Sequence, residues 1–340
     1  MGGRQIAEQI RKRIEEQERS TLSPRASLAL MSRGRARPEE PCSIRTDYQR
    51  DRDRIVHSKA FRRLKHKTHV FISPEGDHYR TRLTHTMEVA QVSRTIARAL
   101  ALNEDLTEAI ALGHDLGHTP FGHIGEAALS GYLEGGFVHS RQSLRVVDVL
   151  ENSGRGLNLT WEVRDGIVNH SSDGAPATLE GQVVRISDRI AYISSDIDDA
   201  LRAGIISEDD LPGAPVEAFG RTTSQRIDCM AHDMVENSAA CEEIRTSPGT
   251  WALMEELRRF LFERVYIGSI AYSEAEKATR VLQSLAEHYL RHPELMPPEF
   301  QPGRREDPAV GVCDYVAGMT DSYALMKYRE LFLPRSWLVE

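Results

Sequence analysis

The most constraining feature of the chain is the run ALGHDLGHTPFGHIGE at residues 111–126. Three histidines and two carboxylates stand here among residues that are otherwise small or apolar. Histidines scattered over a surface do not gather in this way. A segment that gathers imidazoles beside carboxylates usually holds a metal ion, transfers protons, or does both. We therefore expect the fold to place this run in a site.

The rest of the chain predicts a nearly all-α fold. Helices are predicted over residues 1–20, 83–102, 104–116, 120–133, 179–204, 251–266, 273–290 and 316–332. Asn103 is the expected N-cap of the helix that follows it, and Gly117 its expected end. Thr119-Pro120 predicts the start of the next helix. Strand signals are confined to residues 68–73 and 77–81, which predict at most a small β-hairpin.

Composition narrows the class of protein. The formal net charge of −8 argues against a surface that binds nucleic acid or anionic membrane over its whole extent, although a local basic pocket is compatible with it. The four cysteines lie far apart without a CxxC pair, as expected of reduced thiols in a cytoplasmic protein. No apolar run reaches the roughly 18 residues of a membrane span. We therefore expect a cytoplasmic protein without a membrane partner.

The pair His114-Asp115 suggests a divalent cation site. Neighbouring side chains on a helix point about 100° apart, so both can bind one ion only in the wedge between them. Two further ligands must come from elsewhere, and the candidates are His85 and Asp188. Each of these residues alone is more often a packed or surface residue, but together they favour a metal site. A mixed histidine–carboxylate set suits Mg, Mn, Fe, Co, Ni or Zn.

Two further spacings predict side chains that share a helix face. Asp188, Tyr192 and Asp196 stand at i, i+4 and i+8 of the long helix. Because a core-facing stripe is normally apolar, two carboxylates and a phenol in line indicate the wall of a pocket. His123 and Glu126 stand three residues apart, so the carboxylate can orient the imidazole.

The order of His85, His114-Asp115 and Asp188 resembles the H…HD…D signature of the HD-domain superfamily of metal-dependent phosphohydrolases. Six blocks in the same order, from about residue 24 to the C-terminus, resemble the deoxyguanosinetriphosphate triphosphohydrolase-like family. They are RDRDRIVHSKAFRRLKHKTHVF, HYRTRLTHTMEVAQVSRTIARAL, LGHDLGHTPFGHIGEAAL, NLTWEVRDGIVNHS, RISDRIAYISSDIDDALRAG and DYVAGMTDSYAL. That family splits a deoxynucleoside triphosphate (dNTP) into a deoxynucleoside and inorganic tripolyphosphate.

The resemblance implies the domain organisation. We expect an N-terminal helix and a mobile basic segment at residues 1–45, an HD-domain catalytic core at 46–205, and a C-terminal helical region at 206–340 packed on the core. The mobile part is the Pro-, Gly- and Arg-rich stretch 23–41. The expected fold class is all-α, with an HD-domain helical core and additional C-terminal helices.

The resemblance also implies catalytic and metal-binding roles. His85, His114, Asp115 and Asp188 would hold the divalent metal ion. His123 would handle a proton with Glu126 as its partner, and His139 would donate to phosphate oxygens. His118 would bind substrate, and it could also support the metal ligands or serve a second metal.

Substrate contacts are implied in the same way. Arg82 would contact the α-phosphate, while Arg62 and Arg63 are either further phosphate ligands or a solvated basic face. Tyr192 and Asp196 would face the deoxyribose, where a ring packed under C2′ would exclude a ribose hydroxyl. Many relatives carry Gln where this chain has His69, a position that touches the sugar or base, so the resemblance does not carry over a base preference.

Two other interpretations remain open from the sequence. One is an HD-domain phosphohydrolase that acts on nucleoside monophosphates or cyclic nucleotides. The other is a non-catalytic member that senses nucleotides or binds DNA. The resemblance further implies a homo-oligomer, with single-stranded DNA or a regulatory nucleotide as a candidate partner.

Overall fold

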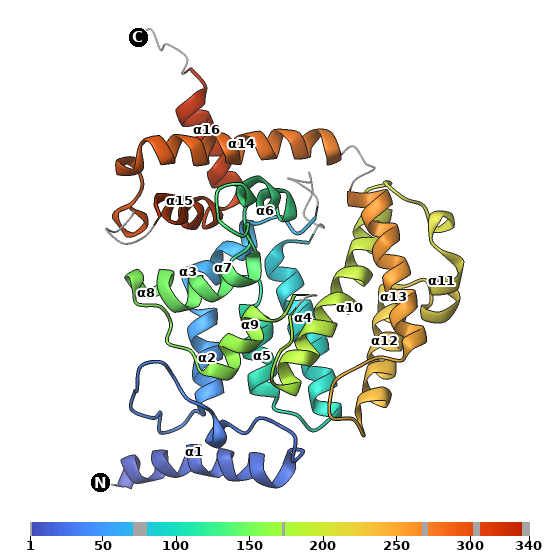
Figure 1. Ribbon diagram of the computed structural model, residues 1–340. Coiled ribbons are helices and arrows are strands. Elements are labelled where there is room, and N and C mark those ends of the chain that lie inside the picture. The colour runs from blue at the N-terminus through green and yellow to red at the C-terminus, as the bar shows by residue number, and fades with distance from the viewer. Residues whose placement is uncertain (1, 71–79, 172–173, 267–270, 302–306, 335–340) are drawn as a thin grey trace.

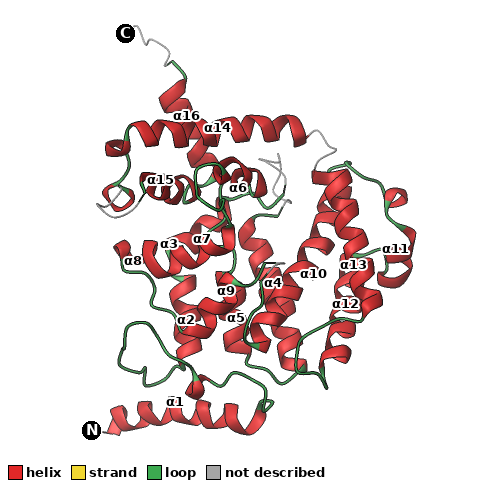
Figure 2. Cartoon of the chain, in the orientation of Figure 1, coloured by secondary structure: helices red, strands yellow, loops and turns green. Residues whose placement is uncertain are grey.

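The computed structural model describes residues 2–70, 80–171, 174–266, 271–301 and 307–334. Within these ranges the chain is helical and contains no strand, which confirms the all-α prediction (Figure 2). The predicted hairpin falls largely on residues 71–79, outside the described residues. At its two ends, Thr68 and Thr81 form an isolated antiparallel bridge.

The helices fall into four groups along the chain (Figure 1). The N-terminal part holds α1 (Gly2–Thr21), α2 (Asp47–Val56) and α3 (Lys59–Arg63). The central part holds α4 (Arg82–Ala99), α5 (Glu104–Gly113), α6 (His123–Ser130), α7 (His139–Arg145), α8 (Glu151–Gly154), α9 (Trp161–Val168) and α10 (Leu179–Arg202). They are followed by α11 (Gly213–Phe219), α12 (Thr223–Ser238) and α13 (Pro248–Leu261). The last group is α14 (Ala271–Arg291), α15 (Pro308–Ala317) and α16 (Asp321–Phe332).

Three apolar clusters hold these helices together. One surrounds α5, which packs against α2, α4 and α9. A second joins α4 and α10 to α12 and α13, at the right of Figure 1. The third joins α6 to α14, α15 and α16 at the top of the figure. Because α6 belongs to the third cluster, the segment that follows the HD pair is packed on the C-terminal helices.

The run at 111–126 is less helical than its sequence predicts. Asn103 caps α5 as expected, accepting a hydrogen bond from the amide of Leu106 at 3.2 Å, but α5 ends at Gly113. The next helix begins at His123 and not at Thr119-Pro120, because Phe121 and Gly122 have φ values of 60° and 59°. These left-handed residues make a turn that separates the HD pair from α6.

The last predicted helix, 316–332, is also broken. It divides into α15 and α16, and Thr320 caps the second of them by accepting a hydrogen bond from the amide of Tyr323 at 3.2 Å. This break brings Asp321 to a helix N-terminus, where its carboxylate accepts hydrogen bonds from the amides of Thr68 and Phe121.

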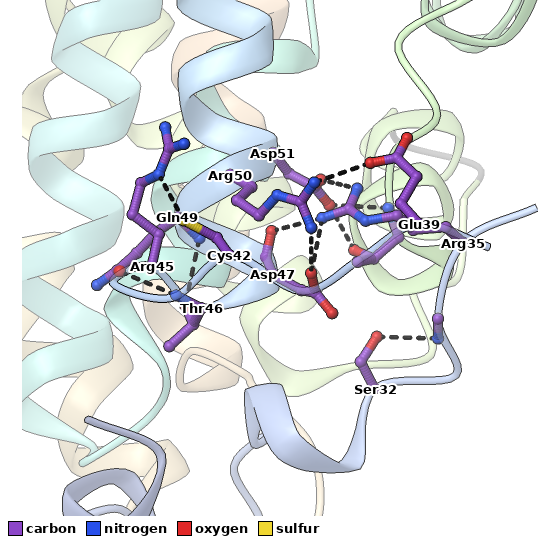
Figure 3. A network of polar contacts seen from close by, with 12 residues as sticks. Ser32, Arg35, Glu39, Cys42, Arg45, Thr46, Asp47, Gln49, Arg50 and Asp51 are labelled. Carbon is purple, nitrogen blue, oxygen red and sulfur yellow. Dashed lines mark hydrogen bonds and ion pairs between the residues drawn. The ribbon is translucent and has the colours of Figure 1, made fainter. Parts of the chain in front are cut away.

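The stretch 23–41, predicted to be mobile, is held against the central helices (Figure 3). The side chain of Arg35 is 5% exposed. It pairs with Asp47 at 3.1 Å and with Asp51 on α2, and it donates to the carbonyl of Asn158 at 2.7 Å. The guanidinium of Arg33 lies 3.7 Å from the centre of the Trp161 ring. These arginines of the segment predicted to be mobile and basic therefore contact other parts of the chain. No helix of the described residues is long and apolar enough to span a membrane.

Candidate metal and catalytic site

A cavity of about 430 Å³ lies between α4, α6, α10 and α13, a volume in the range of small-molecule sites. Most of the predicted site residues line it: His69, Arg82, His85, Asp115, His118, His123, His139, Asp188, Tyr192 and Asp196. His114 and Glu126 lie directly behind this lining, as their contacts below show.

Arg62 and Arg63 do not line this cavity. Arg62 is exposed and donates to the carbonyl of His57 at 3.3 Å. Arg63 donates to the carbonyl of Gly318 at 3.1 Å. Of the two alternatives that the sequence left open for these residues, the exposure of Arg62 fits the solvated basic face, and a phosphate contact by either residue stays a prediction.

One set of side chains, which we call the inner cluster, is built from α4, the end of α5 and α10. It consists of His85, His114, Asp115 and Asp188. Nε2 of His85 lies 3.0 Å from Oδ1 of Asp188. Nε2 of His114 lies 3.5 Å from Oδ1 of Asp115 and 3.7 Å from Oδ1 of Asp188. Three separate helices therefore bring these imidazoles and carboxylates together.

The donor set of the inner cluster fits a cation. Nδ1 of His114 lies 2.6 Å from the carbonyl oxygen of Ala111, so this nitrogen carries the ring proton. Nε2 of the same ring is then a lone pair, and it is buried without a hydrogen-bond partner. It faces carboxylate oxygens, which carry no proton either. A divalent cation between these atoms would satisfy them together.

The electrostatics of the inner cluster favour ionised carboxylates. Burial alone would raise the pKa of Asp115, but His114, while its ring is protonated, and Arg82 hold that pKa well below its usual range. Likewise His85 and His114 lower the pKa of Asp188 against the effect of burial. Nη1 of Arg82 donates to Oδ2 of Asp115 at 2.7 Å, which leaves Oδ1 toward the imidazoles. Both carboxylates are therefore ready to bind a cation.

A second set, the outer cluster, consists of His118, His123, Glu126 and His139. Nδ1 of His123 lies 3.2 Å from Oε2 of Glu126, and the His123 side chain is 75% exposed. Nδ1 of His139 lies 3.2 Å from both carboxylate oxygens, and the backbone amide of His139 donates to Oε1 at 2.8 Å. Glu126 therefore orients two imidazoles, as its spacing from His123 predicted for one of them.

His118 connects the two clusters. Its ring stacks on that of His139 with centroids 4.2 Å apart, and its Nε2 lies 3.7 Å from Oδ1 of Asp115. Burial and the nearby Arg82 hold the pKa of His118 well below its usual value, so this imidazole is neutral. The α7 residue His139 differs, because Glu126 raises its pKa although burial opposes the charge.

The wall opposite the turn is formed by α10. Tyr192 and Asp196 line the cavity together with Asp188, as the helical stripe predicted. Asp196 accepts a hydrogen bond from Tyr266 and lies 3.2 Å from Nδ1 of His69. The His69 ring in turn stacks on His85 at 4.2 Å. These contacts connect the far end of α10 to the inner cluster.

The HD domain model matches residues 82–193, and the model described as phosphohydrolase-associated domain matches residues 244–330. A deoxyguanosinetriphosphate triphosphohydrolase-like protein of Caldanaerobacter subterraneus subsp. tengcongensis is 60% identical over 333 residues, which cover 96% of this chain and 97% of the relative. Proteins of the same description from Desulfatibacillum aliphaticivorans and Clostridium perfringens are 48% and 49% identical, and each alignment covers 96% of this chain and 98% of the relative. The chain belongs to the deoxyguanosinetriphosphate triphosphohydrolase-like family.

This HD-type phosphohydrolase has site residues that sequence reasoning did not assign. Arg185, Arg189, Trp251, Arg258 and Tyr266 also line the cavity. Burial lowers the pKa of another lining residue, His170, to about 3, with the neighbouring His114 acting in the same direction. The only signal for His170 was its place in the block NLTWEVRDGIVNHS.

Two buried residues of this phosphohydrolase connect the turn to the C-terminal helices. Asp321 accepts hydrogen bonds from the amide of Phe121 at 3.0 Å and from the amide of Thr68 at 2.8 Å. The ammonium of Lys67 donates to the carbonyl of Ala317 at 2.8 Å and to that of His118. The segment that carries the outer cluster is therefore held by Asp321, 200 positions from Phe121, and by Lys67, 51 positions from His118, which spacing along the chain does not reveal.

Proposed function

We propose that this phosphohydrolase cleaves dNTPs to a deoxynucleoside and inorganic tripolyphosphate. The observation that carries the proposal is that two chemically different clusters face one cavity. The inner cluster has carboxylates and an imidazole lone pair directed at one point, whereas the outer cluster has imidazoles hydrogen-bonded to one carboxylate. Such a site can hold a cation beside the phosphate and a proton donor beside the leaving group.

The inner cluster would hold the divalent metal through His85, His114, Asp115 and Asp188. When bound, the metal supplies Lewis-acid stabilisation at the α-phosphate. His118 lies between the two clusters, so it is placed to contact the same phosphate.

The substrate carries about four negative charges, and the cavity supplies cationic side chains to meet them. Arg82 lies beside Asp115, while Arg189 and Arg258 line the opposite wall on α10 and α13. This distribution suits a phosphate chain that starts at the inner cluster and extends along the wall. It favours a triphosphate over a monophosphate or a cyclic nucleotide.

His123 is the proposed general acid. Attack of water at the α-phosphorus expels either the 5′-oxygen of the nucleoside or pyrophosphate, and an unassisted 5′-alkoxide is the poorer leaving group. Cleavage to the deoxynucleoside therefore needs a proton donor near that oxygen. His123 is exposed to the cavity and is oriented by Glu126. It can deliver its proton to the leaving oxygen and recover one from solvent.

The sugar is proposed to lie against α10. The ring of Tyr192 lines the cavity one helical turn beyond Asp188, where it would meet the C2′ side of the sugar. A ribose hydroxyl would then collide with the phenol, which accounts for a preference for deoxynucleotides.

The test is a panel of four dNTPs and four NTPs, each with Mn, Mg or Co, with the products separated by chromatography. The proposal expects a deoxynucleoside and tripolyphosphate in equal amounts. A deoxynucleoside monophosphate with pyrophosphate would contradict it. Cleavage of monophosphates or cyclic nucleotides alone would favour another HD-domain phosphohydrolase, and binding without turnover would favour a nucleotide sensor.

A further inference from the structure

Arg189, on α10, is held from two directions by the facing helix α13. Its guanidinium lies over the ring of Trp251, 4.3 Å from the ring centre, a distance at which a cation–π contact stabilises both groups. Its Nη1 donates to Oε1 of Glu255. The side chain of Arg189 is only 11% exposed. One face and one edge of this guanidinium are therefore occupied by residues of α13.

Glu255 also reaches a second arginine of the cavity wall. Its Oε2 lies 3.7 Å from Nη1 of Arg258. Trp251, Glu255 and Arg258 stand at i, i+4 and i+7 of α13, so they share one face of that helix. The two arginines line the cavity, whereas Glu255 is not part of its lining. The carboxylate therefore bridges two guanidinium groups from behind and offsets the repulsion between their charges.

Most of the hydrogen-bonding capacity of Arg189 remains available to a ligand. A guanidinium carries five N–H groups, and Glu255 is the one acceptor that this side chain has among the described residues. Because Arg189 lines the cavity, its other N–H groups can bind an anion there. A long side chain loses rotamer freedom when it binds a ligand, and residues that fix it beforehand reduce this cost.

We propose that Glu255 and Trp251 are positioning residues that hold Arg189 and Arg258 together as one site for the distal phosphates of the substrate. The identity of the ligand rests on the proposed function, whereas the contacts among these four side chains do not. The inner cluster would meet the phosphate next to the sugar, so the two arginines would meet phosphates further along the chain. This pair would make the cavity bind three phosphates more tightly than one.

Inorganic tripolyphosphate tests the proposal, because it carries the phosphate chain without a sugar or a base. Its dissociation constant is measured by calorimetry on the full chain loaded with Mn, with inorganic phosphate as the comparison ligand. We expect Glu255→Leu to weaken tripolyphosphate binding about tenfold and to change phosphate binding by less than about twofold. Glu255→Gln, whose amide oxygen can still accept from Arg189, should recover most of the loss.

Trp251 is tested in the same way. Trp251→Leu should weaken tripolyphosphate binding by about two- to fivefold, the usual range of a cation–π contact near a surface. Trp251→Phe is the matched control that keeps an aromatic ring and should lose less. If Trp251 instead stacks on the base, Trp251→Leu will weaken dNTP binding and leave tripolyphosphate binding unchanged, which would overturn the role proposed for this residue.

Hydrolysis of a dNTP gives an independent measurement. The distal phosphates would be held equally in the bound substrate and in the transition state, so Glu255→Leu should raise KM about tenfold and change kcat by less than about twofold. Melting temperatures should match that of the unaltered protein, since the Glu255 side chain is 34% exposed. A fall in kcat at unchanged KM would overturn the proposal.

Two binding results separate this proposal from the proposed function. Unchanged or tighter tripolyphosphate binding in Glu255→Leu would overturn it even if the protein cleaves dNTPs, and tighter binding would show that the carboxylate competes with the phosphate. A protein that cleaves no dNTP, but whose tripolyphosphate affinity falls in Glu255→Leu and recovers in Glu255→Gln, would instead refute the proposed function alone.

Discussion

The inner and outer clusters contain the same residue types, but their hydrogen-bond donors and acceptors are paired differently. In the inner cluster two carboxylates face His85 and His114, and Nε2 of His114 has no hydrogen-bond partner. In the outer cluster one carboxylate, Glu126, hydrogen-bonds two imidazoles. In the inner cluster, no proton lies between the lone pair of His114 and the carboxylate oxygens that it faces. In the outer cluster, ring protons pair both imidazoles with the carboxylate. In the proposed function, the pairing of donors and acceptors, more than residue identity, would separate the metal site from the proton-transfer site.

The two clusters also differ in what supports them. The inner cluster stands on α4, α5 and α10, which pack directly against one another. The outer cluster stands on α6 and α7 and on the turn before α6, which Lys67 and Asp321 fasten to the C-terminal helices. Changes in the C-terminal region should therefore affect proton transfer without removing the metal.

The largest effect is expected from the inner cluster. Asp115→Asn should remove bound metal and abolish hydrolysis, because a carboxylate ligand is replaced by a neutral amide of the same shape. Asp115→Ala should have the same effect with an added loss of about 3–5 kcal/mol of stability, since Arg82 would be left buried without its partner. Metal analysis, activity and urea unfolding measure these outcomes. Full metal occupancy in folded Asp115→Asn would show that the inner cluster is not the metal site. The control variant is Asp209→Ala, at an exposed position.

Substitutions in the outer cluster should lower kcat and leave the metal content unchanged. His123→Ala should lower kcat by about 10²- to 10⁴-fold, the usual contribution of general acid catalysis. Metal analysis of the same sample should give normal occupancy. If the metal is lost with His123, the two clusters act as one metal centre and the distinction between them fails.

A substitution of Tyr192, on the cavity wall formed by α10, should affect the choice between a dNTP and an NTP more than the rate. Tyr192→Ala should lower the preference for a dNTP over its NTP by roughly ten- to a hundredfold, because the steric block at C2′ is removed. The quantity to compare is the ratio of kcat/KM for the two substrates, with Tyr192→Phe as the matched control that keeps the ring. An unchanged ratio in Tyr192→Ala would mean that this ring only packs against α13.

The smallest effect is expected for the hydrogen bonds by which Asp321 holds the turn before α6. Asp321→Asn removes the charge from the acceptor of the Phe121 and Thr68 amides, so we expect a loss of about 1–3 kcal/mol in the free energy of unfolding. The turn that carries His118 and His123 should loosen, and kcat should fall by less than it does in His123→Ala. Urea unfolding, kcat and metal content are the measurements. Loss of metal with unchanged kcat per bound metal would contradict the separate support of the two clusters.

Sequence reasoning predicted what depends on local periodicity. The stripe of Asp188, Tyr192 and Asp196 follows from helical spacing alone, and the structure places all three on one cavity wall. The left-handed turn at Phe121-Gly122 was missed, because Thr119-Pro120 carries a helix-start signal that tertiary contacts override. The spacing of Arg62 and Arg63 could not decide between a phosphate contact and a solvated face, since the direction of the short helix α3 is set by packing, and neither residue lines the cavity.

Contacts between distant segments could not be predicted from spacing. His170 meets His139 only because α9 and α7 pack together. The side chain of Arg35 is buried because Asp47 and Asp51 on α2 and the carbonyl of Asn158 meet at one point, although its own segment has no apolar period. In both cases the partner is a polar group that becomes a neighbour only after folding.

The most direct test of the proposed cleavage at the α-phosphorus is hydrolysis of a dNTP in ¹⁸O-labelled water. If the water attacks the α-phosphorus beside the inner cluster and His123 protonates the departing 5′-oxygen, one label should appear in the tripolyphosphate and none in the deoxynucleoside. Label in a deoxynucleoside monophosphate would show that pyrophosphate leaves instead. Label in the deoxynucleoside would show that the carbon–oxygen bond is cut. Either of these results would contradict the proposed roles of the two clusters, which are metal binding by the inner cluster and proton donation by the outer cluster.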